Sequence, residues 1–167
     1  HFYSKKNLKK EIAAYYGMVS LLDKYVGKIL DKLEELGMEE NTIVVFTTDH
    51  GDFFGQHGFV TKGPYHYEDL LRIPFIAKYP KNIPPGEVKD ALLSLVDLPP
   101  TFLSMIGEDV PQEMSGKDQS AVFTGEKEQI RDHVLCEMHH SPSMVHLKSF
   151  VDEKHKITVY NESNQGE

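Results

Sequence analysis

The apolar run at residues 42–47 (TIVVFT) is the feature that most constrains the fold of this chain. Its apolar residues do not alternate with polar ones, which is typical of a strand buried on both faces of a sheet. Such strands occur in parallel sheets covered by helices, so we expect an α/β fold. A long helix is predicted before the run, because residues 8–36 place apolar side chains at helical spacing. Asn7 is suited to cap its start and Gly37 to end it.

A second strand and a second helix are predicted further along the chain. Residues 73–79 (IPFIAKY) are typical of a strand in which the proline lies at the beginning. Residues 97–106 (DLPPTFLSMI) predict a helix that Asp97 caps and that ends before Gly107. We expect residues 108–124 to form a polar loop.

The last part of the chain predicts strands and no helix. Strand patterns occur at residues 134–138, 145–151 and 155–160, and the last two flank a short hairpin-like turn. We therefore divide the chain into two parts. Residues 1–124 are expected to form half of an α/β core with helices on a mainly parallel sheet, and residues 125–167 a small antiparallel segment.

Composition excludes several classes of protein. The chain has 167 residues and a formal net charge of -8, which argues against a nucleic-acid-binding surface. No stretch reaches the roughly 18 apolar residues of a membrane span. The single cysteine, Cys136, excludes an intrachain disulfide. The chain begins without methionine and ends without a closing element, so we expect a piece of a longer protein. These features leave localisation and oligomeric state open.

Polar residues with ligand chemistry follow the first predicted strand directly, at residues 48–53 (TDHGDF). Sites in open α/β sheets form at the carboxyl ends of strands. The carboxylate of Asp49 and the imidazole of His50 are both competent ligands for a divalent cation, and Gly51 permits a sharp turn after them. The alternative is a purely structural Asx turn at the end of the strand.

Lys62 lies one glycine-rich loop beyond this pair. A lysine in such a loop is commonly solvated, but beside a cation it can neutralise an anionic oxygen or a leaving group. His57 could donate to the same anion or hold the loop in place, and we favour the second role. His66 and Glu68 are interpreted as structural residues that lead into a short helix before Arg72.

The order of motifs resembles the sulfatase family of the alkaline phosphatase superfamily, and the resemblance covers nearly the whole chain. It rests on seven stretches taken together. They are residues 41–52 (NTIVVFTTDHGD), 55–58 (GQHG), 62–63 (KG), 67–68 (YE), 72–76 (RIPFI), 94–101 (SLVDLPPT) and 154–160 (KHKITVY).

This resemblance implies specific roles for three residues. Asp49 and His50 match a pair of metal ligands that is Asp-Asn or Asp-His across the family, and Lys62 matches the lysine that contacts the sulfate ester. The implied cofactor is a divalent metal, calcium first, with magnesium or manganese as alternatives. The implied nucleophile is a formylglycine made from Cys or Ser, and the implied substrate is a sulfated small molecule or sugar.

The resemblance is incomplete in one important respect. The family's nucleophile lies in a Cys/Ser-x-Pro-x-Arg motif upstream of the matched region, and the sequence around Cys136 does not fit that motif. The family's metal site has four protein ligands, and the early aspartate pair among them is missing from this sequence. The two that remain cannot hold a hard cation tightly. We therefore expect this chain alone to be inactive. Two further readings stay open. One is a phosphonate- or phosphate-ester hydrolase of the same superfamily, and the other is a non-catalytic binding domain that retains the fold.

Overall fold

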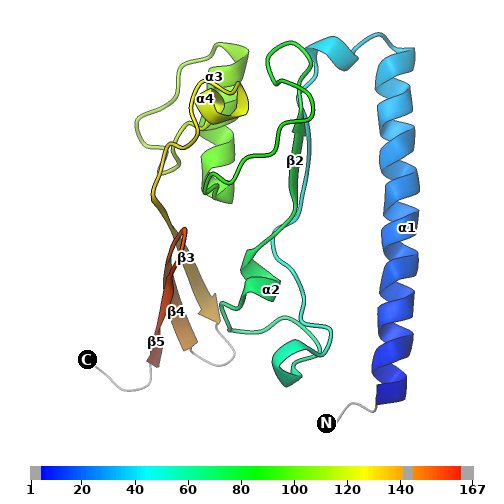
Figure 1. Ribbon diagram of the computed structural model, residues 1–167, viewed down its shortest axis with the longest axis vertical. Coiled ribbons are helices and arrows are strands. Elements are labelled where there is room, and N and C mark those ends of the chain that lie inside the picture. The colour runs from blue at the N-terminus through cyan, green and yellow to red at the C-terminus, as the bar shows by residue number, and fades with distance from the viewer. Residues whose placement is uncertain (1–4, 141–144, 163–167) are drawn as a thin grey trace. The chain divides into compact units, whose positions relative to one another are not determined.

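The computed structural model describes residues 5–140 and 145–162, and it divides into two compact units. The first unit is His1–Gly63 with Tyr67–Lys81, and the second is Pro64–His66 with Asn82–Glu167 (Figure 1). The sequence analysis instead divided the chain at residue 124, into two parts of one larger domain. That division stays a prediction. No helix in the described part of the chain is long and apolar enough to cross a membrane.

The first unit begins with the long predicted helix, α1, at Lys5–Glu35. The sequence predicted that Asn7 caps this helix, but Asn7 lies inside it. The helix already includes the two lysines before Asn7, and lysine is a good helix former. The predicted end is confirmed. Gly37 adopts a φ of +63°, and its N–H donates to the Glu34 carbonyl oxygen at 2.9 Å. The 3₁₀ helix η1, Glu39–Asn41, then leads into the first strand.

Strands β1, Val44–Thr47, and β2, Phe75–Lys78, pair side by side in a two-stranded sheet (Figure 1). Both strands were predicted, but their direction was not. The pairing is antiparallel, whereas the apolar pattern of β1 predicted a parallel partner. A parallel return needs a crossover of a dozen or more residues, usually a helix. The described segment between these strands holds only the short helices η2, Gln56–Gly58, and α2, Glu68–Leu71.

Burial of β1 also differs from the expectation. Phe46 on β1 is 45% exposed and Ile76 on β2 is 64% exposed, so the pair is not buried on both faces within this chain. The apolar pattern of β1 therefore shows that the strand is suited to burial, but the described residues do not cover both faces of the sheet. The mixed α/β class itself is confirmed.

The second unit is organised around a buried carboxylate. Helix α3, Leu98–Ile106, follows the 3₁₀ turn η3, Leu95–Asp97, and ends at Gly107 with φ +82°, as predicted. Asp97 is 0% exposed and occupies the N-cap position of α3, but its side chain does not cap this helix as predicted, because the carboxylate is used elsewhere. Its carboxylate accepts from the Ser94 N–H at 3.0 Å and the Lys117 N–H at 2.8 Å, and it forms an ion pair with Arg131. A further short helix, α4, Ser120–Phe123, lies in the segment that was predicted as a loop.

The predicted antiparallel segment is confirmed as a three-stranded sheet in the second unit. Its strands are β3, His133–His140, β4, Val145–Asp152, and β5, Lys156–Glu162, in the order β3-β4-β5. The hairpin between β4 and β5 is closed by the Asp152 carboxylate, which accepts from the N–H groups of Lys154 and His155 at 2.7 and 2.6 Å. Leu147 in the central strand is fully buried.

A buried histidine contacts the middle of this sheet. His66 is 5% exposed, and its Nδ1 lies 2.7 Å from Ser149 Oγ on β4. Ser149 Oγ in turn lies 2.7 Å from Thr158 Oγ1, on the paired strand β5. Burial, assisted by the positive charge of Lys156, lowers the pKa of His66. The structural role expected for His66 is therefore an uncharged anchor within the second unit.

We expect this anchor to make stability fall as the pH decreases. The unfolded chain binds a proton at His66 near the ordinary pKa of 6.5, whereas the folded chain binds it only at lower pH, so acidification favours unfolding. Urea unfolding at pH about 7.5 and about 5.5 measures the effect. Between these two pH values, His66→Gln should lose less unfolding free energy than the wild type loses. The matched control is His155→Gln, at an exposed histidine, which should keep the wild-type dependence. An equal pH dependence in the wild type and His66→Gln would contradict this assignment.

We also expect Asp97→Asn to destabilise the second unit strongly, by about 3–5 kcal/mol, because it leaves the Arg131 charge buried without its counter-ion. Thermal and urea unfolding measure the effect. Asp132→Asn is the control, since the Asp132 carboxylate is 87% exposed and its loss should change unfolding little. Similar effects of the two substitutions would show that the buried pair does not organise this unit.

Candidate functional site

The candidate site begins where β1 ends. Asp49 and His50 follow this strand, and the Asp49 Oδ2 and His50 Nε2 atoms lie 3.5 Å apart. The backbone N–H of His50 donates to Asp49 Oδ1 at 3.0 Å, and the Thr48 hydroxyl lies 3.3 Å from the same oxygen. The two side chains predicted as ligands are thus held with their ligand atoms close together.

Lys62 joins this pair directly. Its Nζ lies 2.8 Å from Nε2 of His50. On the other side of the ring, His50 Nδ1 lies 2.7 Å from the Gly51 carbonyl oxygen, which can only accept. Together the two contacts assign the ring as the Nδ1–H tautomer, with the Nε2 lone pair accepting from the ammonium. The structure therefore brings Asp49, His50 and Lys62 together within the first unit.

Gly51 is required for a different reason from the one that the sequence suggested. It does not adopt a positive φ, so conformational freedom is not what the position needs. Its N–H donates to the Leu70 carbonyl oxygen at 3.0 Å, and a Cβ on Gly51 would overlap the carbonyl oxygen of Asp69. Helix α2 thus lies against the backbone that carries the Asp49–His50 pair, and only glycine allows that approach.

The loop between the ligand pair and Lys62 is anchored at both ends. Phe53 is 1% exposed and its ring packs against Phe59, with centroids 5.1 Å apart. The N–H of Phe54 donates to the Val60 carbonyl at 3.2 Å, and that of Gly55 donates to the Phe59 carbonyl at 2.7 Å. Because the loop is closed on itself, the backbone reaches Lys62 along a defined path.

His57 in this loop contacts α2. Its Nε2 lies 3.2 Å from Asp69 Oδ2, and its ring stacks on Tyr67 with centroids 3.9 Å apart and planes at 13°. Its φ is +54°, an uncommon value for a residue other than glycine, and the surrounding contacts hold it there. These contacts favour the loop-holding role over donation to an anion. Asp69 was missed by the sequence reasoning, and no motif around it marks it.

The electrostatics suit a cation at the ligand pair. Loss of hydration is the largest single influence on Asp49 and opposes its ionisation, but several groups together outweigh it and lower its pKa. They are the backbone N–H groups of Asp49 and His50 and the Thr48 hydroxyl. Asp49 therefore presents an ionised carboxylate at neutral pH.

The residues present fit half of a metal site. Two ligand atoms 3.5 Å apart can both reach one cation at about 2.3–2.6 Å, the distance typical of calcium. Among residues 5–140 and 145–162, however, no group of three or more His, Cys, Asp or Glu side chains could hold a metal ion. The pair thus needs further ligands.

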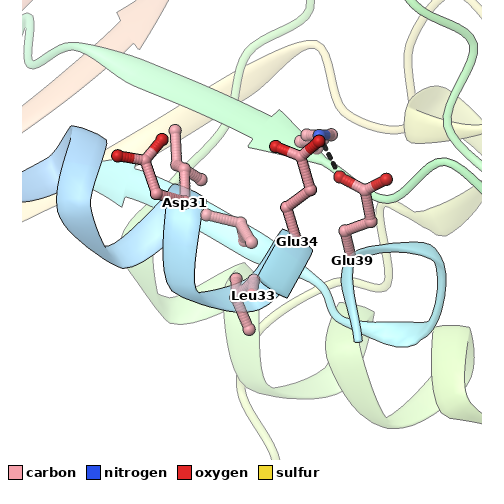
Figure 2. A pocket seen from close by; sticks show the side chains of 7 residues that line it. Asp31, Leu33, Glu34 and Glu39 are labelled. Atoms are coloured by element: carbon pink, nitrogen blue, oxygen red, sulfur yellow. Dashed lines mark ion pairs between the residues drawn. The ribbon is translucent and has the colours of Figure 1, made fainter. Parts of the chain in front are cut away.

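A cavity elsewhere in the first unit is unrelated to these residues. It has a volume of about 90 Å³ and lies where the end of α1 meets η1 and the β1–β2 sheet. Figure 2 shows the carboxylates of Asp31, Glu34 and Glu39 around it, with Glu39 in an ion pair with Lys78 at 3.8 Å. Lys78 pairs with Val44, at the opposite end of the sheet from Thr47, so the cavity is separate from the ligand pair.

Comparison with known proteins gives a consistent family. A sulfatase family model matches residues 2–108. An N-acetylglucosamine-6-O-sulfatase of Bacteroides thetaiotaomicron is 38% identical over 112 residues, which are 67% of this chain and 20% of that protein. Over its matched part, this chain therefore spans about a fifth of the length of that relative.

Solved structures agree over nearly the whole chain. A 2-O GAG sulfatase superposes with a TM-score of 0.88 and 30% identity, covering 98% of this chain and 36% of the other. A second neighbour, solved with its substrate D-glucosamine-2-N,6-O-disulfate, gives a TM-score of 0.84 and 25% identity, covering 98% and 37%. A phosphonate monoester hydrolase from Silicibacter pomeroyi shares the fold at 20% identity and a TM-score of 0.77, covering 98% and 37%. The predicted fold class is confirmed by these neighbours.

We expect Gly51→Ala to destabilise the first unit by about 1–3 kcal/mol or more, because the added methyl group must displace α2 or the ligand pair. Gly17→Ala is the matched control. Gly17 lies within α1 with nothing near its Cβ position, so alanine there should stabilise by about 1 kcal/mol. Urea unfolding of both variants measures the difference. Equal stability of Gly51→Ala and the wild type would mean that the close approach is not needed.

Proposed function

Because this chain belongs to the sulfatase family, we propose that it supplies two metal ligands and the anion-binding lysine of a sulfate-ester hydrolase. The observation that carries the proposal is the contact of Lys62 Nζ with His50 Nε2 at 2.8 Å, beside the Asp49 carboxylate. This contact places the positive charge of Lys62 beside two side chains that can bind a cation. The ammonium and a bound cation together would suit an anionic ester.

Each residue has a separate task in this proposal. Asp49 and His50 would hold a divalent cation, calcium by preference, which polarises the sulfate group when it is bound. Lys62 binds an anionic oxygen of the ester and stabilises the charge that develops on the leaving group. His57, fixed by Asp69, keeps the loop that precedes Lys62 in its shape.

The chemistry needs residues beyond those described. Hard cations take six to eight oxygen ligands, and the described residues offer two protein ligands at this point. The proposed nucleophile is a formylglycine from an upstream Cys/Ser-x-Pro-x-Arg motif, which this sequence lacks. We therefore propose that the whole protein hydrolyses sulfate esters and that the 167-residue chain alone does not.

The proposed substrate is a sulfated sugar. The support comes from two similar proteins, one named for N-acetylglucosamine-6-O-sulfate chemistry and the other solved with a disulfated glucosamine. A phosphonate or phosphate ester is the second candidate. Its support is the fold shared with a phosphonate monoester hydrolase, which at 20% identity concerns the fold alone.

Hydrolysis of 4-nitrophenyl sulfate by the complete gene product tests the proposal. We expect Lys62→Ala to lower kcat/KM by about 100- to 1,000-fold, because an electrostatic donor at the developing charge is lost. Lys81→Ala, at an exposed lysine after β2, is the control and should keep wild-type activity. A chelator should abolish turnover and added Ca²⁺ should restore it.

Three results would overturn the proposal. The first is full activity of Lys62→Ala, and the second is full activity in the presence of the chelator. The third is a clear preference of the complete protein for 4-nitrophenyl phenylphosphonate, which would establish the second candidate instead.

A further inference from the structure

We propose that three exposed lysines in the first turns of α1 bind further sulfate groups of a sulfated polysaccharide, beyond the ester that is hydrolysed. They are Lys6, Lys9 and Lys10, and together they form what we call the basic face. The choice of a sulfated chain as the ligand rests on the proposed function. The inference adds a second binding surface to the site and names a polymer, in place of a single sugar, as the substrate class.

The three lysines of the basic face lie on one side of α1. Positions three and four apart are neighbours on a helix surface, so Lys9 and Lys10 both lie next to Lys6. All three side chains are exposed. Among the described residues, no ion pair engages any of the three. Their ammonium groups are therefore available to an anion from solvent.

This arrangement of charges opposes the stability of the helix that carries it. Like charges three or four positions apart repel each other. The start of a helix also favours acidic side chains over basic ones, yet the first turn of α1 contains no acidic residue. The chain as a whole has a net charge of -8, so it is not short of acidic residues. Local conflicts of this kind are expected at functional sites, and the sulfates of a bound polyanion would remove this one.

The turns that carry the basic face pack against the loop that leads to Lys62. Leu8 lies on the other side of the helix from the lysines, and its Cδ2 atom is 2.7 Å from the position of a Cβ on Gly55. Further along α1, the ring of Tyr15 packs on Phe54 with centroids 4.3 Å apart. Figure 1 shows the start of α1 beside this loop. The basic face is thus held next to the candidate site, across the width of one helix.

This placement favours a polymer over a single sugar. A helix with its side chains is about 10–12 Å across, which is wider than one sugar ring. The loop contacts one side of α1 and the basic face occupies the other. A single sugar held at Lys62 therefore does not reach the basic face, whereas a chain of several sugars can bind to both.

The composition of the basic face suits sulfates better than nucleic acid. A lysine carries a compact charge on a flexible stem, which adapts to sulfates at irregular spacing. Proteins that bind single-stranded nucleic acid combine such charges with aromatic side chains on which the bases stack. The next turn on this side of α1 instead carries Ala13 and Ala14.

Binding of dextran sulfate to the complete gene product tests the inference. Isothermal titration calorimetry is carried out with a chelator present, so that a metal at the proposed ligand pair does not contribute. We expect substitution of the basic face to weaken binding by about 10- to 100-fold, because three charges that attract the polyanion are lost. The slope of log K against log salt should fall by about two to three, because fewer counterions are released. The variant is Lys6→Gln, Lys9→Gln and Lys10→Gln together.

The matched control changes the net charge equally but at scattered positions. It replaces three exposed lysines outside α1, as Lys81→Gln, Lys127→Gln and Lys154→Gln together. This control should bind dextran sulfate as tightly as the wild type, which separates a local surface from overall charge. Glutamine is a good helix former, so the basic-face variant should keep the wild-type unfolding curve in urea. Unsulfated dextran should not bind to any of the three proteins.

Inhibition of 4-nitrophenyl sulfate hydrolysis shows whether one chain engages both the basic face and the site. Dextran sulfate should inhibit the wild-type protein. Its inhibition constant should be about 10- to 100-fold higher in the basic-face variant, since the same three charges are lost.

The outcomes distinguish this inference from the proposed function. Equal affinity of the wild type and the basic-face variant for dextran sulfate would overturn the inference, as would an equal loss in the scattered control. Tighter binding of double-stranded DNA than of dextran sulfate at the same salt concentration would assign the face to nucleic acid and overturn it too. Binding at the basic face without inhibition would show that the face and the site do not share a chain. Absence of sulfate-ester hydrolysis by the wild type, with dextran sulfate binding intact, would overturn the proposed function alone.

Discussion

The close approach of helix α2 to Gly51 is the constraint on which the candidate site depends. The Leu70 carbonyl accepts from the Gly51 N–H, and the Asp69 carbonyl leaves no room for a side chain there. The same residue, Asp69, contacts His57 through its carboxylate. One helix of four residues, Glu68–Leu71, therefore fixes both the turn after Asp49 and His50 and the loop that leads to Lys62.

The two units differ in what stabilises them. The second unit has a fully buried carboxylate at Asp97 with several hydrogen-bond and ion-pair partners. Loss of a partner would leave a buried charge less compensated and would destabilise the unit. The first unit has few buried side chains, and residues on α1 such as Leu22 and Ile29 are each 61% exposed. The site in the first unit thus owes its geometry to close local backbone contacts more than to a large core.

The sequence predicted the elements well because each has a local signal. Helix α1, strands β1 and β2, helix α3 and the last three strands follow from periodicity and from glycine or proline at their ends. Strand direction could not be read from a pattern that reports burial alone. The role of Asp69 could not be predicted from the sequence either. It depends on a contact with His57, which lies 12 positions away, and on the position of the Asp69 carbonyl oxygen against Gly51. The proximity of Asp49, His50 and Lys62 could be anticipated because residues with ligand chemistry follow a strand end, and their roles stay predictions.

The identity of the second proposed ligand decides how many lone pairs it can present. The resemblance that the sequence shows allows either Asp-Asn or Asp-His at this pair, and the chain has His50. An asparagine carbonyl oxygen has two lone pairs and can accept from a lysine while it binds a cation. An imidazole whose Nδ1–H is committed to the backbone has one. The histidine form of the pair therefore presents a single ring donor atom, Nε2, and this follows from the 2.7 Å contact between His50 Nδ1 and the Gly51 carbonyl oxygen.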